Sequence, residues 1–183
     1  MANVILRIEH DNDCMSPEDC DNQWKLYSFS TRHSNFVHPD KFSNVGMRRK
    51  LHVGTAFQLS YYEHGNSLWM LSDGSIPAGV EFQWDGVRKA GVLVFEHSPK
   101  LMGAKTREER AKDAQCFLDE YNAWANGECY SYGICKEGYE DNGDLLDSCC
   151  GFIGSDSIKQ ELSEILKDHT VIKVIGNASY IWN

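Results

Sequence analysis

Two hydrophobic periods follow each other along this chain, and the switch between them near Thr106 is what most constrains its fold. Before Thr106, apolar residues lie in short runs typical of β-strands, as in 4–8 and 24–31. After it, they recur at the three- and four-residue spacing of an amphipathic helix. Residues 31–51 show neither period and are predicted to form a long loop.

Turn signals predict how the strands of the first half are connected. The segment His64-Gly65-Asn66-Ser67 separates runs 56–63 and 68–72, and Gly and Asn tolerate the positive φ angles of a tight turn. Asp85-Gly86 separates runs 80–84 and 91–96 in the same way. Consecutive hairpins build an antiparallel meander, so we expect one in the first half of the chain.

The second half carries the helix signals. The segment Thr106-Arg107-Glu108-Glu109 fits a capping box, and a stripe follows at helical spacing, formed by Phe117, Leu118, Tyr121 and Trp124. This long helix should end near Asn126-Gly127. A shorter helix is predicted to begin near Ser157, among strands at 129–136, 144–152 and 171–175. The predicted fold class is therefore α+β: an antiparallel meander sheet with one long and one shorter helix packed against it.

The composition suits one folded domain. With 183 residues, 42% of them hydrophobic and 11% aromatic, the chain can bury a good core, and no linker-like segment divides it, so a single domain over 1–183 is predicted. No run approaches the ~18 apolar residues of a membrane span, and the N-terminus turns acidic before a signal-peptide pattern develops. We therefore expect a cytoplasmic protein without membrane contact, whose seven cysteines are reduced.

Acidic residues dominate the charge. The 27 Asp and Glu outnumber the 18 Lys and Arg, for a net charge of −9, which disfavours direct binding to nucleic acid. The basic triplet Arg48-Arg49-Lys50 is expected to lie in a solvated loop. The acid gathers in two stretches, one over residues 9–21 and one that contains Glu137, Glu140, Asp141, Asp144 and Asp147. Such clusters can steer the approach of a basic partner.

Two kinds of catalytic or metal chemistry are conceivable. Oxygen ligands for Ca²⁺ or Mg²⁺ could come from Asp11, Asp13, Asp19 and Asp21, although the spacing is not that of an EF-hand. The alternative is that these side chains bond their own backbone in turns. A nucleophile could be Cys149 or Cys150, if activated by one of four histidines: His10, His33, His64 or His97.

Other motifs argue against further chemistry. Cys14 and Cys20 share a five-residue gap with Cys129 and Cys135, which is wider than zinc sites use. Phosphate-binding loops, serine nucleophile elbows and dinucleotide fingerprints are not found in the sequence. No cofactor is predicted.

Four segments, IEHD (8–11), SPEDCDN (16–22), YNAWANGECY (121–130) and DSCCGFIG (147–154), resemble an uncharacterised family of small proteins of bacteriophages and related mobile elements. The resemblance covers most of the chain in the same order. It implies a phage context and a place in the cytoplasm of the infected bacterium, but no activity. Small nonstructural phage proteins commonly bind a host protein, so the resemblance favours an interaction protein or inhibitor.

The function that these observations favour is a phage-encoded accessory protein that binds and modulates a host protein with a basic surface, such as a nucleic-acid-processing or defence component. The expected partner-binding residues are Glu137, Glu140, Asp141 and Asp144, with aromatic anchors among Tyr61, Tyr62 and Trp84. The alternative is a small enzyme that uses a cysteine nucleophile or a metal-binding acidic loop.

Overall fold

The structure, a computed structural model, describes residues 2–20, 23–74, 76, 80, 82–139 and 145–182. Contacts between residues divide the chain into two compact units. Unit 1 consists of 1–15 and 123–183, and unit 2 of 16–122. Each unit has its own four-stranded sheet and its own apolar core. The single-domain expectation for 1–183 stays a prediction, since it depends on whether the two units unfold together.

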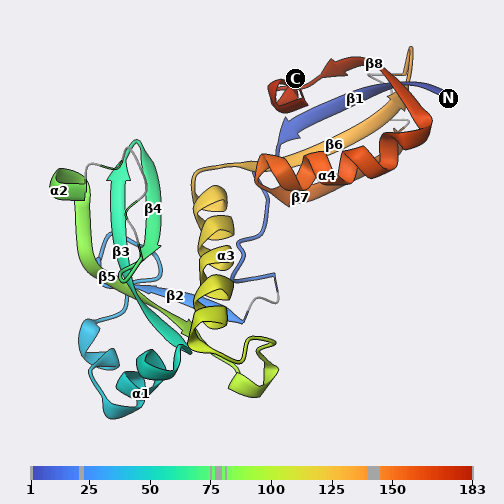
Figure 1. The fold of residues 1–183 in the computed structure, drawn as a ribbon. Helices are drawn as coiled ribbons and strands as arrows, with labels where there is room; N and C mark the ends of the chain where they lie inside the picture. The colour runs from blue at the N-terminus through green and yellow to red at the C-terminus, as the bar shows by residue number, and fades with distance from the viewer. Residues whose placement is uncertain are drawn as a thin grey trace. The chain divides into compact units, whose positions relative to one another are not determined.

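Unit 1 is built on a sheet with the strand order β7-β6-β1-β8 (Figure 1). Its strands are β1 (Ala2–His10), β6 (Cys129–Lys136), β7 (Leu145–Ile153) and β8 (His169–Ile175). β1 is antiparallel to β6, and β6 to β7, whereas β8 runs parallel to β1. The first and last strands of the chain are therefore neighbours.

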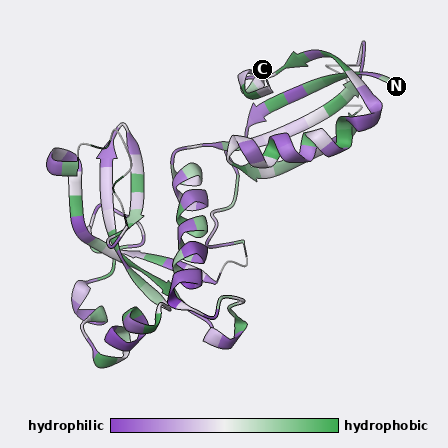
Figure 2. Ribbon diagram, in the orientation of Figure 1, coloured by the Kyte–Doolittle hydropathy of each residue, from purple (hydrophilic) through white to green (hydrophobic). Residues whose placement is uncertain are grey.

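One face of this sheet is covered by α4 (Ser155–Ile165). Alternate residues of β1 point to that face, and Ile158 and Leu162 of the helix are fully buried against them. Short 3₁₀ segments follow at Leu166–Asp168 and Ser179–Trp182, and the second adds Ile181 to the same core. Both hydrophobic and hydrophilic residues occur along β1 and α4 (Figure 2), and Val4, Leu6 and Ile8 are the residues of β1 that share a buried core with the helix.

Unit 2 holds the second sheet, with the strand order β2-β5-β3-β4 and antiparallel pairing throughout. Its strands are β2 (Trp24–Ser28), β3 (Ala56–His64), β4 (Asn66–Leu71) and β5 (Gly86–Phe95). The unit also contains α1 (Val45–Val53), the single turn α2 (Phe82–Asp85), and 3₁₀ segments at Pro39–Phe42 and Pro99–Leu101. On one face, Met47 of α1 packs against Ala56, Val92 and Val94.

The long helix α3 (Arg107–Ala125) covers the other face of the unit 2 sheet. Its capping box forms as predicted, because the Glu109 amide donates to Thr106 Oγ1 at 3.1 Å and the Thr106 amide to Glu109 Oε2 at 3.0 Å. Phe117 and Leu118 lie in the core with the inner residues of the strands. From Ala123 the chain belongs to unit 1.

Side chains of α3 also hydrogen-bond to both outer strands of that sheet. The indole Nε1 of Trp24 in β2 donates to Asp113 Oδ2 at 2.8 Å. At the opposite edge, the Trp69 amide in β4 donates to Asn122 Oδ1 at 2.7 Å, and Asn122 Nδ2 donates to the Trp69 carbonyl at 2.9 Å. The buried Asn122 thus satisfies a strand edge beside which the described residues place no further strand.

The predicted fold class is wrong in its architecture. The strands do not form one meander sheet with two helices against it; they form two sheets, and each has its own covering helix. β1 leaves the first-half strands to pair with β6 and β8. The reason is physical: a two-residue period shows which face of a strand is buried, but not which strand lies beside it.

Two local predictions also fail. The segment 31–51, expected as a loop, contains most of α1, whose signals were Asn44 at the N-cap, accepting from the Met47 amide at 2.8 Å, and Gly54 at the C-cap with φ 76°. The strand expected over 80–84 is not formed, because residues 82–84 lie in α2 together with Asp85; Gly86, expected with Asp85 in a hairpin turn, begins β5 instead. No helix within the described residues is long and apolar enough to cross a membrane.

The stripe of α3 gives a direct stability test. Phe117 is 2% exposed in the unit 2 core, so Phe117→Ala should lower the free energy of unfolding by roughly 3–5 kcal/mol. Lys112→Ala, on an exposed position of the same helix, is the matched control and should change it by less than about 0.5 kcal/mol. Urea unfolding measures both. If Phe117→Ala lowers the free energy of unfolding by less than about 1 kcal/mol, the face of α3 that carries Phe117 does not pack in the core.

Candidate functional site

The acidic N-terminal loop uses its carboxylates to bond backbone groups. Asp11 Oδ1 accepts from the Asp13 amide at 3.1 Å, and Asp11 Oδ2 accepts from the Gly151 amide of β7 at 2.8 Å. The Asp11 amide in turn donates to the Cys129 carbonyl at 2.8 Å. The interpretation that these side chains bond backbone in turns is confirmed for Asp11, and this loop is fastened to β6 and β7.

The other residues proposed as metal ligands are divided between the two units. Asp19 Oδ2 accepts from Ser16 Oγ at 2.7 Å, in unit 2, whereas Asp11 and Asp13 belong to unit 1. Asp21 lies outside the described residues. Within the part of the chain that the structure describes, no three side chains of His, Cys, Asp or Glu are grouped so that they could hold a metal ion.

The two candidate nucleophiles, Cys149 and Cys150, are exposed residues of β7. The Cys149 thiol donates to the Cys150 carbonyl at 3.6 Å. Three of the four proposed histidines hydrogen-bond elsewhere: His10 to Tyr180, His33 to Ser28 and His64 to Asp85. His97 lies against the ring of Phe95 in unit 2. The described residues thus contain no thiol–imidazole pair at Cys149 or Cys150.

A serine–histidine pair does exist in unit 2, but it is buried. Ser28, fully inaccessible to solvent, accepts from the Ser30 amide at 3.0 Å and has its Oγ 2.7 Å from His33 Nδ1. The His33 ring makes edge contacts with Tyr61 and Trp69, with ring centroids 4.9 and 5.4 Å apart. Because no substrate can reach Ser28, this pair stabilises the end of β2 and is not a catalytic centre.

The two acidic stretches, although far apart in the sequence, lie largely in one unit. Residues 9–13 and 137–147 both belong to unit 1, and the hydrogen bond from Gly151 to Asp11 joins the loop after β1 to β7. Glu137 is exposed directly after β6. Of the other predicted partner-binding residues, Glu140, Asp141 and Asp144 lie outside the described residues. Asp147 is exposed on β7, where Tyr132 donates to it at 3.1 Å.

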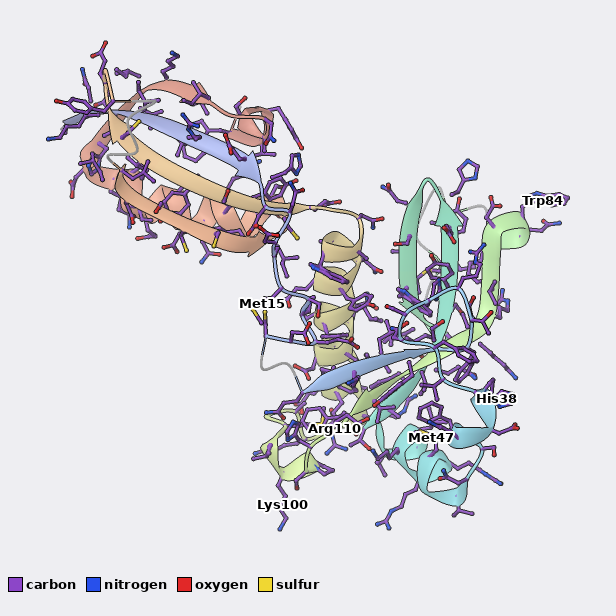
Figure 3. All side chains as sticks on the ribbon, turned by 180° about the vertical axis from the view of Figure 1, so that it is seen from behind. Met15, His38, Met47, Trp84, Lys100 and Arg110 are labelled. Atoms are coloured by element: carbon purple, nitrogen blue, oxygen red, sulfur yellow. The ribbon has the colours of Figure 1, made fainter. Side chains whose placement is uncertain are left out.

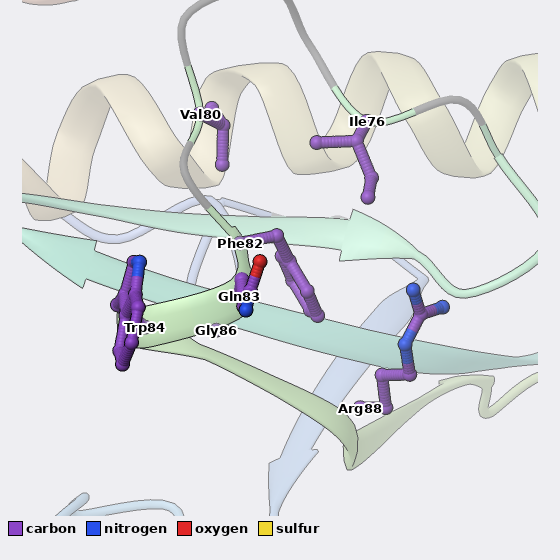
Figure 4. A pocket seen from close by; sticks show the side chains of 7 residues that line it. All are labelled: Ile76, Val80, Phe82, Gln83, Trp84, Gly86 and Arg88. Atoms are coloured by element: carbon purple, nitrogen blue, oxygen red, sulfur yellow. The ribbon is translucent and has the colours of Figure 1, made fainter.

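Among the three expected aromatic anchors, Trp84 is the exposed one. It is 78% accessible on α2 and projects from the body of unit 2 (Figure 3), whereas Tyr61 is 8% accessible and Tyr62 half-buried. Trp84 borders a hollow of about 830 Å³ that also involves Ile76, Phe82 and Arg88 (Figure 4). Sequence reasoning named Trp84 but could not find this hollow, because it predicted a strand over 80–84 where the structure has the helical turn α2.

Comparisons of the chain with known protein families, with curated proteins and with solved structures find no match. The relation to a phage protein family therefore stays a prediction from the sequence.

The thiols should react according to their environments. The exposed Cys20, Cys116, Cys149 and Cys150 should react rapidly with Ellman's reagent in the native protein. Cys129 should react only after unfolding, because burial, and secondarily the thiol of Cys14, raise its pKa to about 12. Denatured, unreduced protein should yield nearly all seven thiols. Recovery of four or fewer would show that disulfides form.

A double variant, Cys149→Ser with Cys150→Ser, is the control for this assignment. It should remove two of the rapidly reacting thiols and leave the slow ones unchanged. A rapid fraction unaltered by this change would contradict the exposure of β7.

The His33 cluster predicts a pH-dependent stability. Burial, and secondarily the charge of Arg32, lower the pKa of His33, while Glu63 opposes them. The folded state therefore favours the neutral imidazole. The free energy of unfolding is not reduced by His33 above the unfolded pKa of about 6.5, and it falls as the pH decreases below that value. His33→Gln keeps a hydrogen-bonding group for Ser28 and should weaken this dependence in urea unfolding between about pH 7.5 and 5. Identical pH profiles for variant and parent would refute it.

Proposed function

We propose that this chain is a phage-encoded accessory protein that binds a host protein through the acidic surface of unit 1 and thereby modulates or inhibits it. The observation that carries this proposal is the uneven distribution of charge between the units. Unit 1 contains thirteen Asp and Glu against five Lys and Arg, a net charge of −8. Unit 2 contains fourteen against thirteen, a net charge of −1.

Little of the negative charge of unit 1 is neutralised within the unit. Among its described residues, two carboxylates form ion pairs: Glu9 with Arg7 at 3.6 Å, and Glu164 with Lys167. Most of the others are exposed, among them Glu128, Glu137, Asp147, Asp156 and Glu161. Uncompensated carboxylates on one compact unit produce a negative field that favours encounter with a positively charged surface.

The partner that fits this field is a host protein whose basic surface normally holds nucleic acid. Carboxylates on unit 1 would occupy the positions of phosphates, so binding would compete with nucleic acid and block its processing. The cytoplasm of the infected bacterium, which the family resemblance implies, would contain such partners. The alternative of a thiol enzyme has weaker support, since Cys149 and Cys150 have no histidine at hand among the described residues.

The experiment combines pull-down from a bacterial lysate with surface-plasmon kinetics on the purified partner. Neutralising Glu137, Glu140, Asp141 and Asp144 together, by Gln and Asn, should slow association about tenfold and change dissociation little, because steering acts on the encounter. Raising the salt concentration from about 0.05 to 0.5 M should also slow the association of the parent protein, because salt screens the charges. Duplex DNA should compete for the partner.

A matched variant controls for net charge alone. Neutralising four exposed acids of unit 2, Asp40, Glu108, Asp119 and Glu120, changes the total charge equally but leaves unit 1 intact. It should slow association much less. Three results would exclude the electrostatic mechanism: an association rate that does not change with salt, one that does not change with the unit 1 substitutions, or one that falls equally in both variants.

A further inference from the structure

The hollow beside Trp84 has a chemistry opposite to that of unit 1. It lies in unit 2, at α2 and the start of β5, and about 830 Å³ of space is bounded by the described residues Ile76, Val80, Phe82, Gln83, Trp84, Gly86 and Arg88. Trp84 and Arg88 stand at opposite ends, with Phe82 between them (Figure 4). None of these lining residues is acidic.

The apolar side of the hollow is unusually accessible. Trp84 is 78% exposed, and two aliphatic neighbours, Ile76 and Val87, are 45% and 54% exposed. Exposed Trp beside aliphatic residues is typical of the anchors that dominate binding energy in protein interfaces. Since Trp84 remains so open, the hollow suits a side chain of a partner better than a small molecule, which needs a more enclosing pocket.

The polar side is cationic. The Arg88 guanidinium lies 5.2 Å from the centroid of the Phe82 ring, and it has no carboxylate partner within the described residues. The nearby Asp85 is already paired with His64 Nδ1, at 3.0 Å. Lys89 follows directly and has a positive φ of 57° where the pairing of β3 with β5 is irregular. Non-glycine residues with a left-handed backbone cluster at functional sites.

Gly86 fits its place in this hollow because a side chain there would collide. An ideal Cβ on Gly86 would lie 2.5 Å from both Cγ and the carbonyl oxygen of Phe82. The edge of β5 beside it is also accessible: β2 pairs with β5 only from Gly91 to Phe95, so residues 86–89 have no described strand on that side. A peptide passing here would find main-chain donors and acceptors next to the hollow.

We infer that the hollow between Trp84 and Arg88 binds a peptide segment of a partner protein in which an apolar side chain stands next to a carboxylate. The apolar group packs on Trp84 and Phe82, and the carboxylate pairs with Arg88, which offers a planar fork of donors. Charge complementarity selects an acidic segment, in contrast to the basic partner of unit 1. The site uses none of the unit 1 carboxylates of the proposed function and does not depend on it; Trp84, expected from the sequence as an anchor for the basic partner, is assigned here to the acidic segment instead.

The test uses the intact chain and the synthetic peptide acetyl-Ala-Phe-Glu-Ala-amide, followed by nitrogen–proton correlation spectra. We expect saturable shifts of the Trp84 indole and the Gly86 and Val87 amides, with a dissociation constant on the order of 1 mM. The same peptide with Lys in place of Glu should bind more weakly by about fivefold or more, as should Arg88→Gln with the parent peptide. Trp84→Ala should abolish the shifts at Gly86 and Val87.

Lys25→Gln, an exposed charge removal elsewhere in unit 2, is the control and should leave the affinity unchanged. Because Trp84, Arg88 and Lys25 are exposed, the spectra of the variants should keep the folded pattern. Three results would overturn the inference: no saturable shift at about 10 mM peptide, equal binding of the Glu and Lys peptides, or a single-stranded oligonucleotide that shifts the same signals more strongly than the peptide.

Discussion

Trp24 and Trp69 lie on the two outer strands of the unit 2 sheet, and one helix hydrogen-bonds to both. Asp113 accepts from the indole of Trp24, and about two and a half turns further along α3 the side-chain amide of Asn122 pairs with both main-chain groups of Trp69. Between them Phe117 and Leu118 fill the core. Loss of Asn122 would leave a buried N–H and C=O unpaired, at roughly 1–3 kcal/mol each, so this helix both closes the core and protects an edge.

The local elements of the chain were largely predictable, because each leaves a signal within a few residues. The hairpin around Gly65, the capping box at Thr106 and the end of α3 at Gly127 follow from turn and cap chemistry. Strand partnership was not predictable, since nothing in the pattern of β1 shows that it lies between β6 and β8. The prediction that Trp124 belongs to the core stripe of the long helix is wrong for a related reason. Trp124 has the spacing of that stripe, yet its indole donates to the Cys14 carbonyl in unit 1.

The candidate site divides in the same way. Composition predicts an acidic surface, but only the assignment of residues to units shows that nearly all of the excess charge belongs to unit 1. The acidic loop suggested metal ligands because the sequence shows the carboxylates but not the backbone amides that donate to them. Asp11, which accepts from two such amides, is the example. Trp84 could be named as an aromatic residue, whereas its exposure depends on α2, a single turn that no pattern marks.

The two units are nested along the chain, which bears on how the acidic surface is assembled. Unit 2 is inserted between β1 and the remainder of unit 1. The strands that pair with β1 therefore lie more than a hundred residues further along the chain. The entropic cost of closing so long a loop grows only slowly with its length. Within unit 1 the two joined segments meet where Asp11 bonds to Cys129 and Gly151. These hydrogen bonds join the acidic loop after β1 to β7, which carries the exposed Asp147, so this part of the negative surface forms only when β1 and β7 are both in place.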